Sequence, residues 1–557
     1  MSLRFFAIGF ILLLVGTSLL GQQDFYASYK FTEADTLRGA LRPERTCYDV
    51  TFYHLNIEVD LADRALDGYV DMSYVAVEDF ERLQVDLFAN MDLEKVWWGT
   101  QSLPFERIHN AVFISFPQTQ TKGSQGTIRM VYSGRPIVAA NAPWDGGFVW
   151  TEDKRGRSWV GVACEGTGAS LWWPNKDHLS DEPDSMRISV EVPAQYMVVA
   201  NGNLEAVEEL GKTARYHWRV SYPINNYNVS ISIGHYTHFN DEYYALDGDT
   251  LALDYYVLDY NEDKARDHFR QVHDVLECFE YYLDKYPFWE DGFALVETPY
   301  LGMEHQSGIA YGNKYMRGYL GGMIPRDMNW DYIIVHETGH EYFGNSLSCN
   351  DLAEMWIHES FTTYLESLFV EYTMSYADAV RYLNSQRKFI YNREPIIGPR
   401  GVNFDDWAGS DHYYKGAWML HTLRSAIGDD EQWFGILKGF YRKYALSPVT
   451  TADFVHYVNE ATGQDWTPFF KQYLYYAKIP TLEYQLEEIG KDLRVRYRWN
   501  TPVVDFHMPI QVGKAGKYLR VYPKVGEWQE AMVSRAEAKE FAVAQELYLV
   551  DTKRIRE

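Results

Sequence analysis

The chain has 557 residues, more than one hydrophobic core usually organises, so we expect two to four domains. Its content of 46% hydrophobic and 16% aromatic residues excludes a disordered chain and predicts a globular protein. The formal charge of -26 argues against nucleic acid as a partner, because a polyanion would be repelled, whereas cationic ligands suit this charge.

The N-terminus has the pattern of a signal peptide. An apolar run extends from Phe5 to Leu20 after a short start that contains Arg4. We therefore place a signal peptide at residues 1–21 and expect an exported protein, periplasmic or secreted. The alternative is a chain tethered to the membrane by an uncleaved N-terminal segment. Beyond this segment we expect no stable membrane insertion, because no later run is long and apolar enough to span a bilayer.

Changes in hydrophobic period divide the rest of the chain into three domains. Short alternating strands start at Cys47 and predict an N-terminal β domain of sandwich type at residues 22–250. The period becomes helical after Asn261, which predicts a mainly helical domain at residues 251–478. Strands return in a small C-terminal β domain of sandwich type at residues 479–557. The predicted fold class is multidomain α+β.

The cysteines do not form a metal or redox motif. They lie far apart and contain no C-x-x-C pair, which excludes a thiolate zinc ribbon and a thioredoxin-like site. Disulfides after export and four small buried thiols both remain open. The four positions are Cys47, Cys164, Cys278 and Cys349.

One helical run carries a metal motif. The run WDYIIVHETGHEYFG has the apolar spacing of a buried helix, lacks proline and is expected to open at Asn329 or Asp331. His336 and His340, four residues apart, project from one face of such a helix and can bind a single Zn²⁺. Glu337 lies beside them, where it can take a proton from metal-bound water. The sequence therefore predicts a catalytic zinc site.

A catalytic zinc normally has three protein ligands, so a third is required. Glu359 is the candidate. It follows His340 after 18 intervening residues, in a second helical stretch at 352–370 that can turn back across the first helix. Glu366 lies seven residues further on, on nearly the same helical face, where it can orient a ligand histidine.

These motifs carry a family resemblance. The string HETGH, followed after 18 residues by Glu359 within WIHESFTTYLE, resembles the metal site of the aminopeptidase N-type zinc metallopeptidases, the gluzincin aminopeptidases. Upstream, LGMEH (Leu301–His305) resembles the G-x-M-E-N exopeptidase motif of this family. Downstream, YYKG (Tyr413–Gly416) resembles its Y-x-K-G motif. The order of β, helical and β segments fits the same family from about residue 45 onwards.

The resemblance implies a saddle-like N-terminal β domain, a thermolysin-like catalytic domain and one Zn²⁺ per chain. It further implies that Glu304 binds the free α-amino group of a peptide, as an ammonium requires a carboxylate partner, and that Gly302 and Met303 of the same motif are substrate-binding residues. By the same correspondence Tyr413 would donate its hydroxyl to the oxyanion of the reaction.

Four positions depart from the family pattern. Leu301 and His305 stand where glycine and asparagine are usual. His358 and Ser360, on either side of Glu359, likewise stand where asparagine and glycine are usual. The metal-binding residues themselves match.

Glu165 is a further candidate for substrate binding. It lies in the run CEGTG, shortly before Trp172, and resembles in position a family glutamine that lines the pocket for the first side chain of the substrate. A carboxylate there would add negative charge. The hypothesis is that Glu165 assists in binding the amino group or favours a basic first residue.

The predicted function is a zinc-dependent aminopeptidase that hydrolyses the N-terminal residue from peptides through a zinc-activated water, with Glu337 as base. The expected partners are peptides with a free N-terminus. Two alternatives remain open: an endopeptidase of thermolysin type, and a non-catalytic scaffold that retains the fold. The presence of Glu304 argues against an endopeptidase, because that class lacks an anchor for the amino group.

Overall fold

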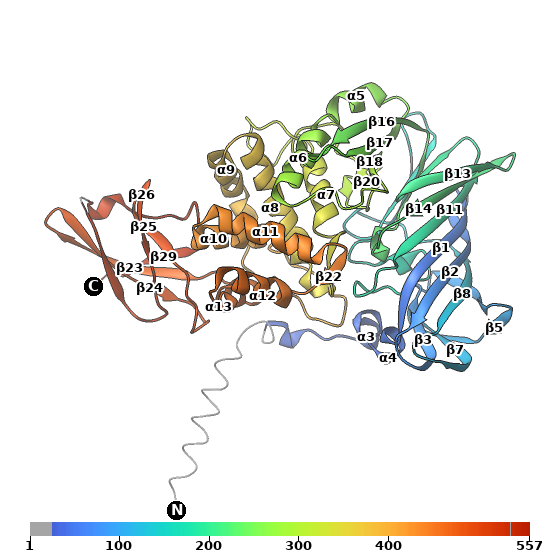
Figure 1. The fold of residues 1–557 in the computed structure, drawn as a ribbon, viewed down its shortest axis with the longest axis horizontal. Coiled ribbons are helices and arrows are strands. Elements are labelled where there is room, and N and C mark those ends of the chain that lie inside the picture. Colours follow the sequence, from blue (N-terminus) through green and yellow to red (C-terminus); the bar gives the residue numbers. More distant parts are fainter. Residues whose placement is uncertain (1–24, 535, 557) are drawn as a thin grey trace, which may run out of the picture.

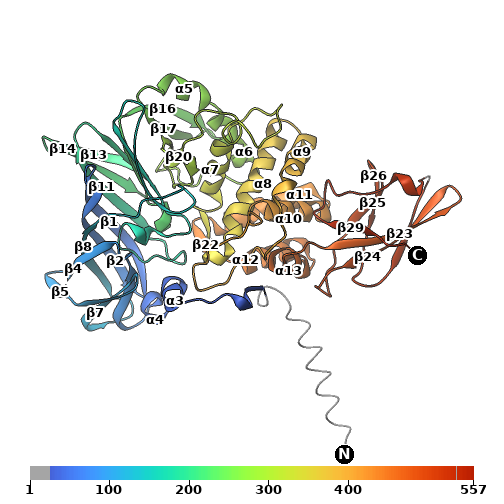
Figure 2. The same cartoon turned by 180° about the vertical axis from the view of Figure 1, so that it is seen from behind.

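The computed structural model describes residues 25–534 and 536–556, so the signal peptide predicted at 1–21 lies outside it. The molecule is elongated, with an N-terminal β region at one end, helices in the middle and a smaller β region at the other end (Figures 1 and 2). This arrangement confirms the predicted fold class. Within the described residues, no helix is both long and apolar enough to cross a membrane.

Layered sheets form the N-terminal region. Its strands are β1 (Tyr48–Asp60), β2 (Ala65–Ala76), β3 (Phe80–Asp86), β4 (Met91–Trp98), β5 (Gln101–Leu103), β6 (Phe105–Ile108), β7 (Ala111–Gln120), β8 (Gln125–Gly134), β9 (Gly147–Glu152), β10 (Ser158–Ala163), β11 (Ser185–Pro193), β12 (Met197–Ala200), β13 (Asn203–Glu209), β14 (Thr213–Val220) and β15 (Ile231–Gly234). An eight-stranded sheet has the order β13-β14-β11-β1-β2-β8-β4-β5. Smaller sheets, β12-β15-β10-β9 and β3-β7-β6, accompany it.

Alternation along β1 shows why this segment forms a strand. Tyr53, Leu55, Ile57 and Val59 are buried, and every second residue between them is more exposed. This period of two places one face of the strand on the core and the other towards solvent.

Another sheet lies at the start of the central region. Its strands are β16 (Tyr236–Tyr244), β17 (Thr250–Leu258), β18 (Phe293–Glu297), β19 (Gly302–Met303) and β20 (Ile309–Tyr311), in the order β16-β17-β18-β20-β19. The sheet begins at Tyr236, within the range predicted for the N-terminal domain, and the domain boundary stays a prediction. Strands β17, β18 and β20 are parallel, and β19 runs antiparallel to β20 at the edge.

Helices complete the central region. They are α5 (Glu262–His268), α6 (Gln271–Tyr282), α7 (Tyr332–Tyr342), α8 (Trp356–Thr373), α9 (Tyr376–Gln386), α10 (Tyr414–Ile427), α11 (Asp430–Tyr444), α12 (Thr451–Thr462) and α13 (Thr467–Tyr475). Strands β21 (Leu347–Cys349) and β22 (Ser447–Val449) pair between them. Every residue of α7 is buried, and so are the first fifteen residues of α8. The two helices therefore form the centre of the core, which explains why polar side chains on them must find partners.

The C-terminal region is built from β23 (Thr481–Ile489), β24 (Asp492–Asn500), β25 (Ile510–Lys514), β26 (Lys517–Val521), β27 (Gln529–Val533), β28 (Phe541–Val543) and β29 (Asp551–Arg554). These strands form a four-stranded sheet, β27-β24-β23-β29, and a three-stranded sheet, β26-β25-β28. Buried side chains of this region, Trp499 and Tyr548 among them, belong to one hydrophobic cluster with the helices of the central region.

Short α-helices precede the first strand among the residues that the structure describes. They are α3 (Glu33–Gly39) and α4 (Pro43–Thr46), and they lie where the N-terminal β region meets the central region (Figure 1). The four cysteines are buried and have free thiols, so the structure contains no disulfide between them.

Candidate metal centre

Helix α7 is held at its N-terminus by Asp331, one of the two residues from which the helix was expected to open. The carboxylate of Asp331 accepts hydrogen bonds from the backbone N–H groups of Ile333 and Ile334, at 2.9 and 3.4 Å. It also accepts hydrogen bonds from the side chains of Tyr311 at 2.8 Å and Asn313 at 2.8 Å. This cap anchors the first turn of the helix one turn before the metal motif.

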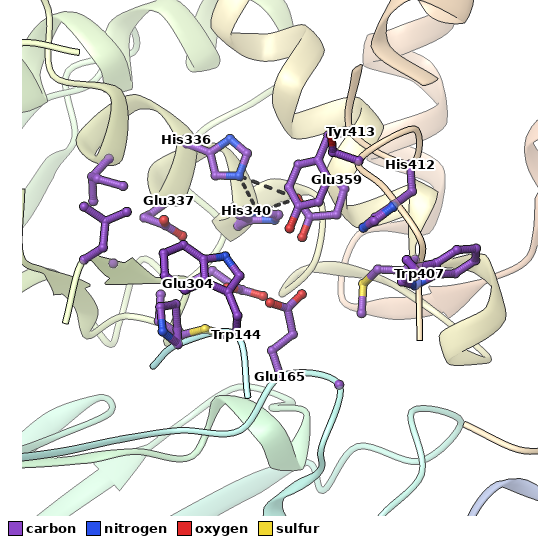
Figure 3. A pocket seen from close by; sticks show the side chains of 18 of the residues that line it. Trp144, Glu165, Glu304, His336, Glu337, His340, Glu359, Trp407, His412 and Tyr413 are labelled. Carbon is purple, nitrogen blue, oxygen red and sulfur yellow. Dashed lines mark hydrogen bonds and ion pairs between the residues drawn. The ribbon is translucent and has the colours of Figure 1, made fainter. Parts of the chain in front are cut away.

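Three ligand atoms converge between α7 and α8. The Nε2 atoms of His336 and His340 are 3.1 Å apart. Oε2 of Glu359 lies 3.6 Å from the Nε2 of His336 and 3.5 Å from that of His340. All three side chains are buried, and the close-up shows them pointing toward one another (Figure 3).

This triangle has the dimensions of a zinc site. Ligands bound at about 2.0–2.1 Å in a tetrahedron lie about 3.3 Å from one another, within the range of separations seen here. Oε2 of Glu359 is buried and has no hydrogen-bond partner among residues 25–534 and 536–556. A buried carboxylate oxygen that lacks a hydrogen-bond partner and points at two imidazole nitrogens indicates a cation-binding site. Two imidazoles and one carboxylate are a donor set that suits Zn²⁺.

Each histidine is oriented through its other nitrogen. Nδ1 of His336 lies 2.7 Å from Oε1 of Glu366, which is fully buried. The second carboxylate oxygen of Glu366 accepts hydrogen bonds from Tyr382 and from Gln386, the latter at 3.0 Å. Nδ1 of His340 lies 3.0 Å from the backbone carbonyl of Phe343. With Nδ1 donating in both cases, each Nε2 keeps its lone pair for a metal.

Two aromatic rings enclose the imidazole of His336. The ring of Tyr332 stacks on it at a centroid distance of 5.1 Å, and the ring of Tyr413 stacks at 6.1 Å. Tyr413 immediately precedes α10, and its side chain lies beside Glu359 (Figure 3). Burial, then the charges of Glu359 and Glu165, raise the pKa of Tyr413 well above its usual value. The phenol therefore keeps its proton and can act as a hydrogen-bond donor.

Glu337 lies beside the ligands on α7, against the edge strand β19. A Cβ atom on Gly302 would lie 2.9 Å from the Glu337 carboxylate and 2.7 Å from Ile333, so this close approach requires glycine. Burial raises the pKa of Glu337 to about 7, although the neighbouring His336 and His340 oppose the shift. A carboxyl group that titrates near neutral pH can both accept and return a proton.

Glu304 comes from the loop after β19 and enters the same cavity. Its side chain is 2% exposed, and Oε1 accepts a hydrogen bond from the hydroxyl of Tyr227 at 3.0 Å. Its backbone carbonyl accepts a hydrogen bond from Asn345 at 2.7 Å. Carboxylate oxygens of Glu304 and Glu337 and a nitrogen of His340 all lie within 4.8 Å of one another. The preceding residue, Met303, is buried and also lines the cavity.

A cavity of about 560 Å³ opens onto these side chains. Glu165 points into it from the N-terminal β region, and Trp144 lies at its rim (Figure 3). Burial, followed by the charge of Glu304, raises the pKa of Glu165 well above its usual value. Among the described residues that line the cavity there is no lysine or arginine, and the acidic ones are Glu165, Glu304, Glu337, Glu359 and Asp405.

Of the residues that depart from the family pattern, His305, His358 and Ser360 are buried, and Leu301, which lines the cavity, is partly buried. Nε2 of His358 accepts a hydrogen bond from the backbone N–H of Cys349 at 2.8 Å, and burial lowers the pKa of His358 to about 3. Burial has the same effect on His305, whose pKa is also about 3. Both imidazoles are therefore neutral and add no positive charge. Ser360 donates a hydrogen bond to the carbonyl of His412 at 2.6 Å.

Two side chains at this site were missed by the reasoning from sequence. Tyr332 is four residues before His336 and hence on the same helical face, a signal that could have identified it. Tyr227 reaches Glu304 from the N-terminal β region, 77 residues earlier in the chain. Nothing in the local pattern around Tyr227 indicates that contact.

Residues 260–473 match the Peptidase family M1 domain. The chain is 21% identical over 442 residues to probable aminopeptidase 2 of Sulfurisphaera tokodaii, a match that spans 76% of this chain and 53% of that protein. It is 22% identical over 315 residues to aminopeptidase N of Escherichia coli, spanning 53% of this chain and 35% of that protein. The chain thus spans about half, or less, of the length of these curated relatives.

Solved structures share the fold. The crystal structure of an M1 zinc metallopeptidase from Deinococcus radiodurans matches with a TM-score of 0.64 at 20% sequence identity, covering 78% of this chain and 94% of that one. A variant from the same organism, solved with a Tyr-Ser-Ala substrate, matches with a TM-score of 0.63 at 20% identity and covers 77% and 94% of the two chains. The chain thus contains a Peptidase family M1 domain at residues 260–473.

Proposed function

We propose that this protein is a zinc-dependent aminopeptidase that hydrolyses the first peptide bond of peptides with a free N-terminus. The observation that carries the proposal is the position of Glu304. Its carboxylate is buried in the cavity, within 4.8 Å of Glu337 and of the ligand His340. An α-ammonium group bound there places the first peptide bond of its substrate beside the metal centre.

The chain supplies the other groups that peptide hydrolysis requires. His336, His340 and Glu359 would hold one Zn²⁺ per chain, which supplies Lewis acidity when bound. Glu337, whose pKa is about 7, accepts a proton from the attacking water and returns it to the leaving amine. Tyr413, which keeps its proton, donates a hydrogen bond to the developing oxyanion.

The names of the relatives agree with this proposal. The curated relatives are aminopeptidases, and solved M1 zinc metallopeptidase variants hold the peptide Tyr-Ser-Ala or the amino acid L-arginine. Both kinds of ligand have a free amino group, the group for which a buried carboxylate such as Glu304 is the expected partner.

A comparison of leucyl-4-nitroanilide with its N-acetylated form tests the proposal. We expect the zinc-loaded protein to cleave the free substrate and to lose nearly all activity on the blocked one. Chelation or Glu337→Ala should abolish activity, and Glu304→Gln should raise KM for the free substrate. Equal cleavage of both substrates would favour an endopeptidase. Absence of activity in a protein shown to contain zinc would favour a non-catalytic scaffold.

For Glu165 we propose a role in substrate binding, because its side chain lies in the same cavity as Glu304. Glu165→Gln should reduce the preference for arginyl over leucyl anilides, or weaken the binding of both if the carboxylate serves the amino group. An unchanged side-chain preference together with unchanged KM values would eliminate both roles.

We also propose that the protein is exported, on the basis of the apolar run from Phe5 to Leu20. N-terminal sequencing of protein recovered from cell fractions tests this. A mature N-terminus near residue 22 in the periplasm or medium would support export, and an intact Met1 on membrane-bound protein would support a tether.

A further inference from the structure

Helix α3 lies where the N-terminal β region meets the central region (Figure 1). Two walls of the cavity come together there. One is the loop of Gly166 and Thr167, next to Glu165, and the other is the segment that contains Asp405. The walls touch, because a Cβ atom on Gly166 would lie 3.3 Å from the Cβ of Asp405.

Arg38, in the last turn of α3, contacts both walls. Its Nη2 donates hydrogen bonds to the backbone carbonyls of Gly166 and Thr167, the latter at 3.1 Å. The same nitrogen lies 3.4 Å from Oδ2 of Asp405. The side chains of Arg38 and Asp405 are 26% and 41% exposed. One guanidinium group thus joins a loop of the β region to a segment of the helical region.

The backbone around Arg38 is fixed in place. Arg45 donates hydrogen bonds to the carbonyls of Leu37 and Arg38, at 3.0 and 2.6 Å. Arg45 is itself fully buried in a paired contact with Asp86, at 2.8 and 2.9 Å. Gly39 packs so closely that a Cβ atom there would lie 2.2 Å from the backbone nitrogen of Asn403. The guanidinium of Arg38 is therefore presented to the two walls from a rigid support.

The charge of Arg38 matters because of what lines the cavity. Lysine and arginine are absent from the lining among residues that the structure describes, whereas Asp405 is one of its carboxylates. Burial raises the pKa of Asp405, and the neighbouring guanidinium of Arg38 opposes this shift. The ion pair removes one negative charge from the field that a substrate side chain meets.

We infer that Arg38 is a positioning residue that joins the two walls of the first-residue subsite, the part of the cavity beside Glu165 that would hold the first side chain of the substrate. By masking Asp405, Arg38 lowers the preference of this subsite for cationic first residues. This inference rests on the proposed aminopeptidase function. Loss of Arg38 would leave the carboxylate of Asp405 unpaired, and an arginine side chain of the substrate would then replace the missing guanidinium.

The test compares arginyl- and leucyl-4-nitroanilide with the full-length, zinc-loaded protein. For Arg38→Gln, the ratio of kcat/KM for the arginyl over the leucyl substrate should rise about three- to fivefold, mainly through KM of the arginyl substrate. Asp405→Asn should lower the ratio, since it leaves Arg38 unpaired, and the double variant should return it near the wild-type value. The matched control is Arg42→Gln, an arginine paired with Glu44 outside the cavity, which should leave the ratio unchanged.

A role for Arg38 in packing alone predicts a different result. Both substrates would then lose kcat/KM by the same factor, and a ratio that stays within twofold of wild type in Arg38→Gln would overturn the inference. If Arg38→Gln does not fold, the charge of Arg38 is tested by comparing the double variant with Asp405→Asn. The ratio of kcat/KM for the arginyl over the leucyl substrate should be higher in the double variant. Equal ratios in that pair would overturn the inference as well.

A binding measurement distinguishes failure of this inference from failure of the proposed function. Calorimetric titration with arginine amide and leucine amide should show the same shift in relative affinity between wild type and Arg38→Gln. If the wild-type protein cleaves neither anilide, the proposed function fails, and the binding ratio still decides whether Arg38 masks Asp405.

Discussion

The imidazole of His336 shows how much of the site is decided by single side chains. Glu366 accepts a hydrogen bond from its Nδ1, and the rings of Tyr332 and Tyr413 stack against it. Each contact restricts the ring, so Nε2 points at the other ligands before a metal binds. Preorganisation of this kind raises metal affinity because less rotational freedom is lost on binding.

Replacing Glu366 tests this orientation. Glu366→Gln should weaken zinc binding by about tenfold, since a neutral amide supports the histidine less strongly than a carboxylate does. The zinc Kd is measured by competition with a chelator. The control is Glu371→Gln on the same helix, whose carboxylate pairs with Arg424 away from the metal centre. A zinc Kd within twofold of wild type in Glu366→Gln would show that the contact does not orient the ligand.

Gly302 gives a second prediction at this scale. In Gly302→Ala the new methyl group would press on Ile333 and on the carboxylate of Glu337. We expect kcat to fall at least about tenfold through the displaced base, and stability to fall by about 1–3 kcal/mol through overpacking. Steady-state kinetics and urea unfolding measure the two effects. As a control, Gly435→Ala on α11 meets no atom within 4 Å and should leave kcat unchanged.

At the scale of elements, α7 depends on the cap at its N-terminus. Asp331 also accepts a hydrogen bond from Nε2 of His268 at 2.7 Å, in addition to its bonds to the helix and to Tyr311 and Asn313. The side chain is fully buried, so each of these donors would be left without its partner if the carboxylate were removed.

Asp331→Ala should therefore cost about 3–5 kcal/mol of unfolding free energy, measured in urea. Asp429→Ala provides the comparison, because Asp429 caps the surface helix α11 through the N–H of Gln432 and should cost about 1 kcal/mol. Equal losses in the two variants would mean that the additional partners of Asp331 contribute nothing.

The first turn of α10 carries a buried lysine that makes stability depend on pH. Nζ of Lys415 donates hydrogen bonds to the carbonyls of Tyr476 and Ala477, each at 2.9 Å, and burial lowers its pKa from 10.5 to about 8. Between these values the unfolded chain binds the proton and the folded chain has released it. Unfolding then takes up a proton, so the contribution of Lys415 to stability rises with pH across this window.

Between pH 7.5 and 9.5 this contribution should rise by roughly 2 kcal/mol. The free energy of unfolding is measured in urea at the two pH values. In Lys415→Met it should no longer show this rise. Lys471→Met, at an exposed position on α13, should retain it. If the unfolding free energy of Lys415→Met rises with pH as much as that of the wild type, the lysine is not the source of the rise.

At the scale of the whole molecule, the hydrophobic clusters do not follow the three regions. One cluster runs from the central helices into the C-terminal sheets and includes Trp499, and a second fills the N-terminal β region and includes Trp218. The metal helices belong to the first cluster. We therefore expect the C-terminal sheets and the metal centre to unfold together.

Trp499→Ala should destabilise by about 3–5 kcal/mol and lower the temperature of zinc release by on the order of 10 °C. Trp218→Ala removes a side chain of the same size from the other cluster and should shift zinc release much less. Zinc release is followed with a chromogenic chelator during a thermal scan. Equal shifts in the two variants would show that the molecule unfolds as one cooperative unit.

Much of the fold could be predicted from the sequence because its signals are local. The alternation along β1 and the helical period around His336 reflect which face of each element is buried. The segment at β16 shows the limit of this reasoning. Its pattern is that of a strand, and only its pairing with β17 assigns it to the sheet of the central region.

The sequence by itself determined which residues can meet at the metal. His336 and His340 share a helical face because 3.6 residues complete one turn, and the imidazole and carboxylate types restrict which ions can bind. The tertiary structure alone decided which side chains join them from a distance. Tyr227 reaches Glu304 across 77 residues, and Arg38 reaches Asp405 across 367. Such contacts depend on how the three regions pack together, and no local hydrophobic period in the sequence predicts that packing.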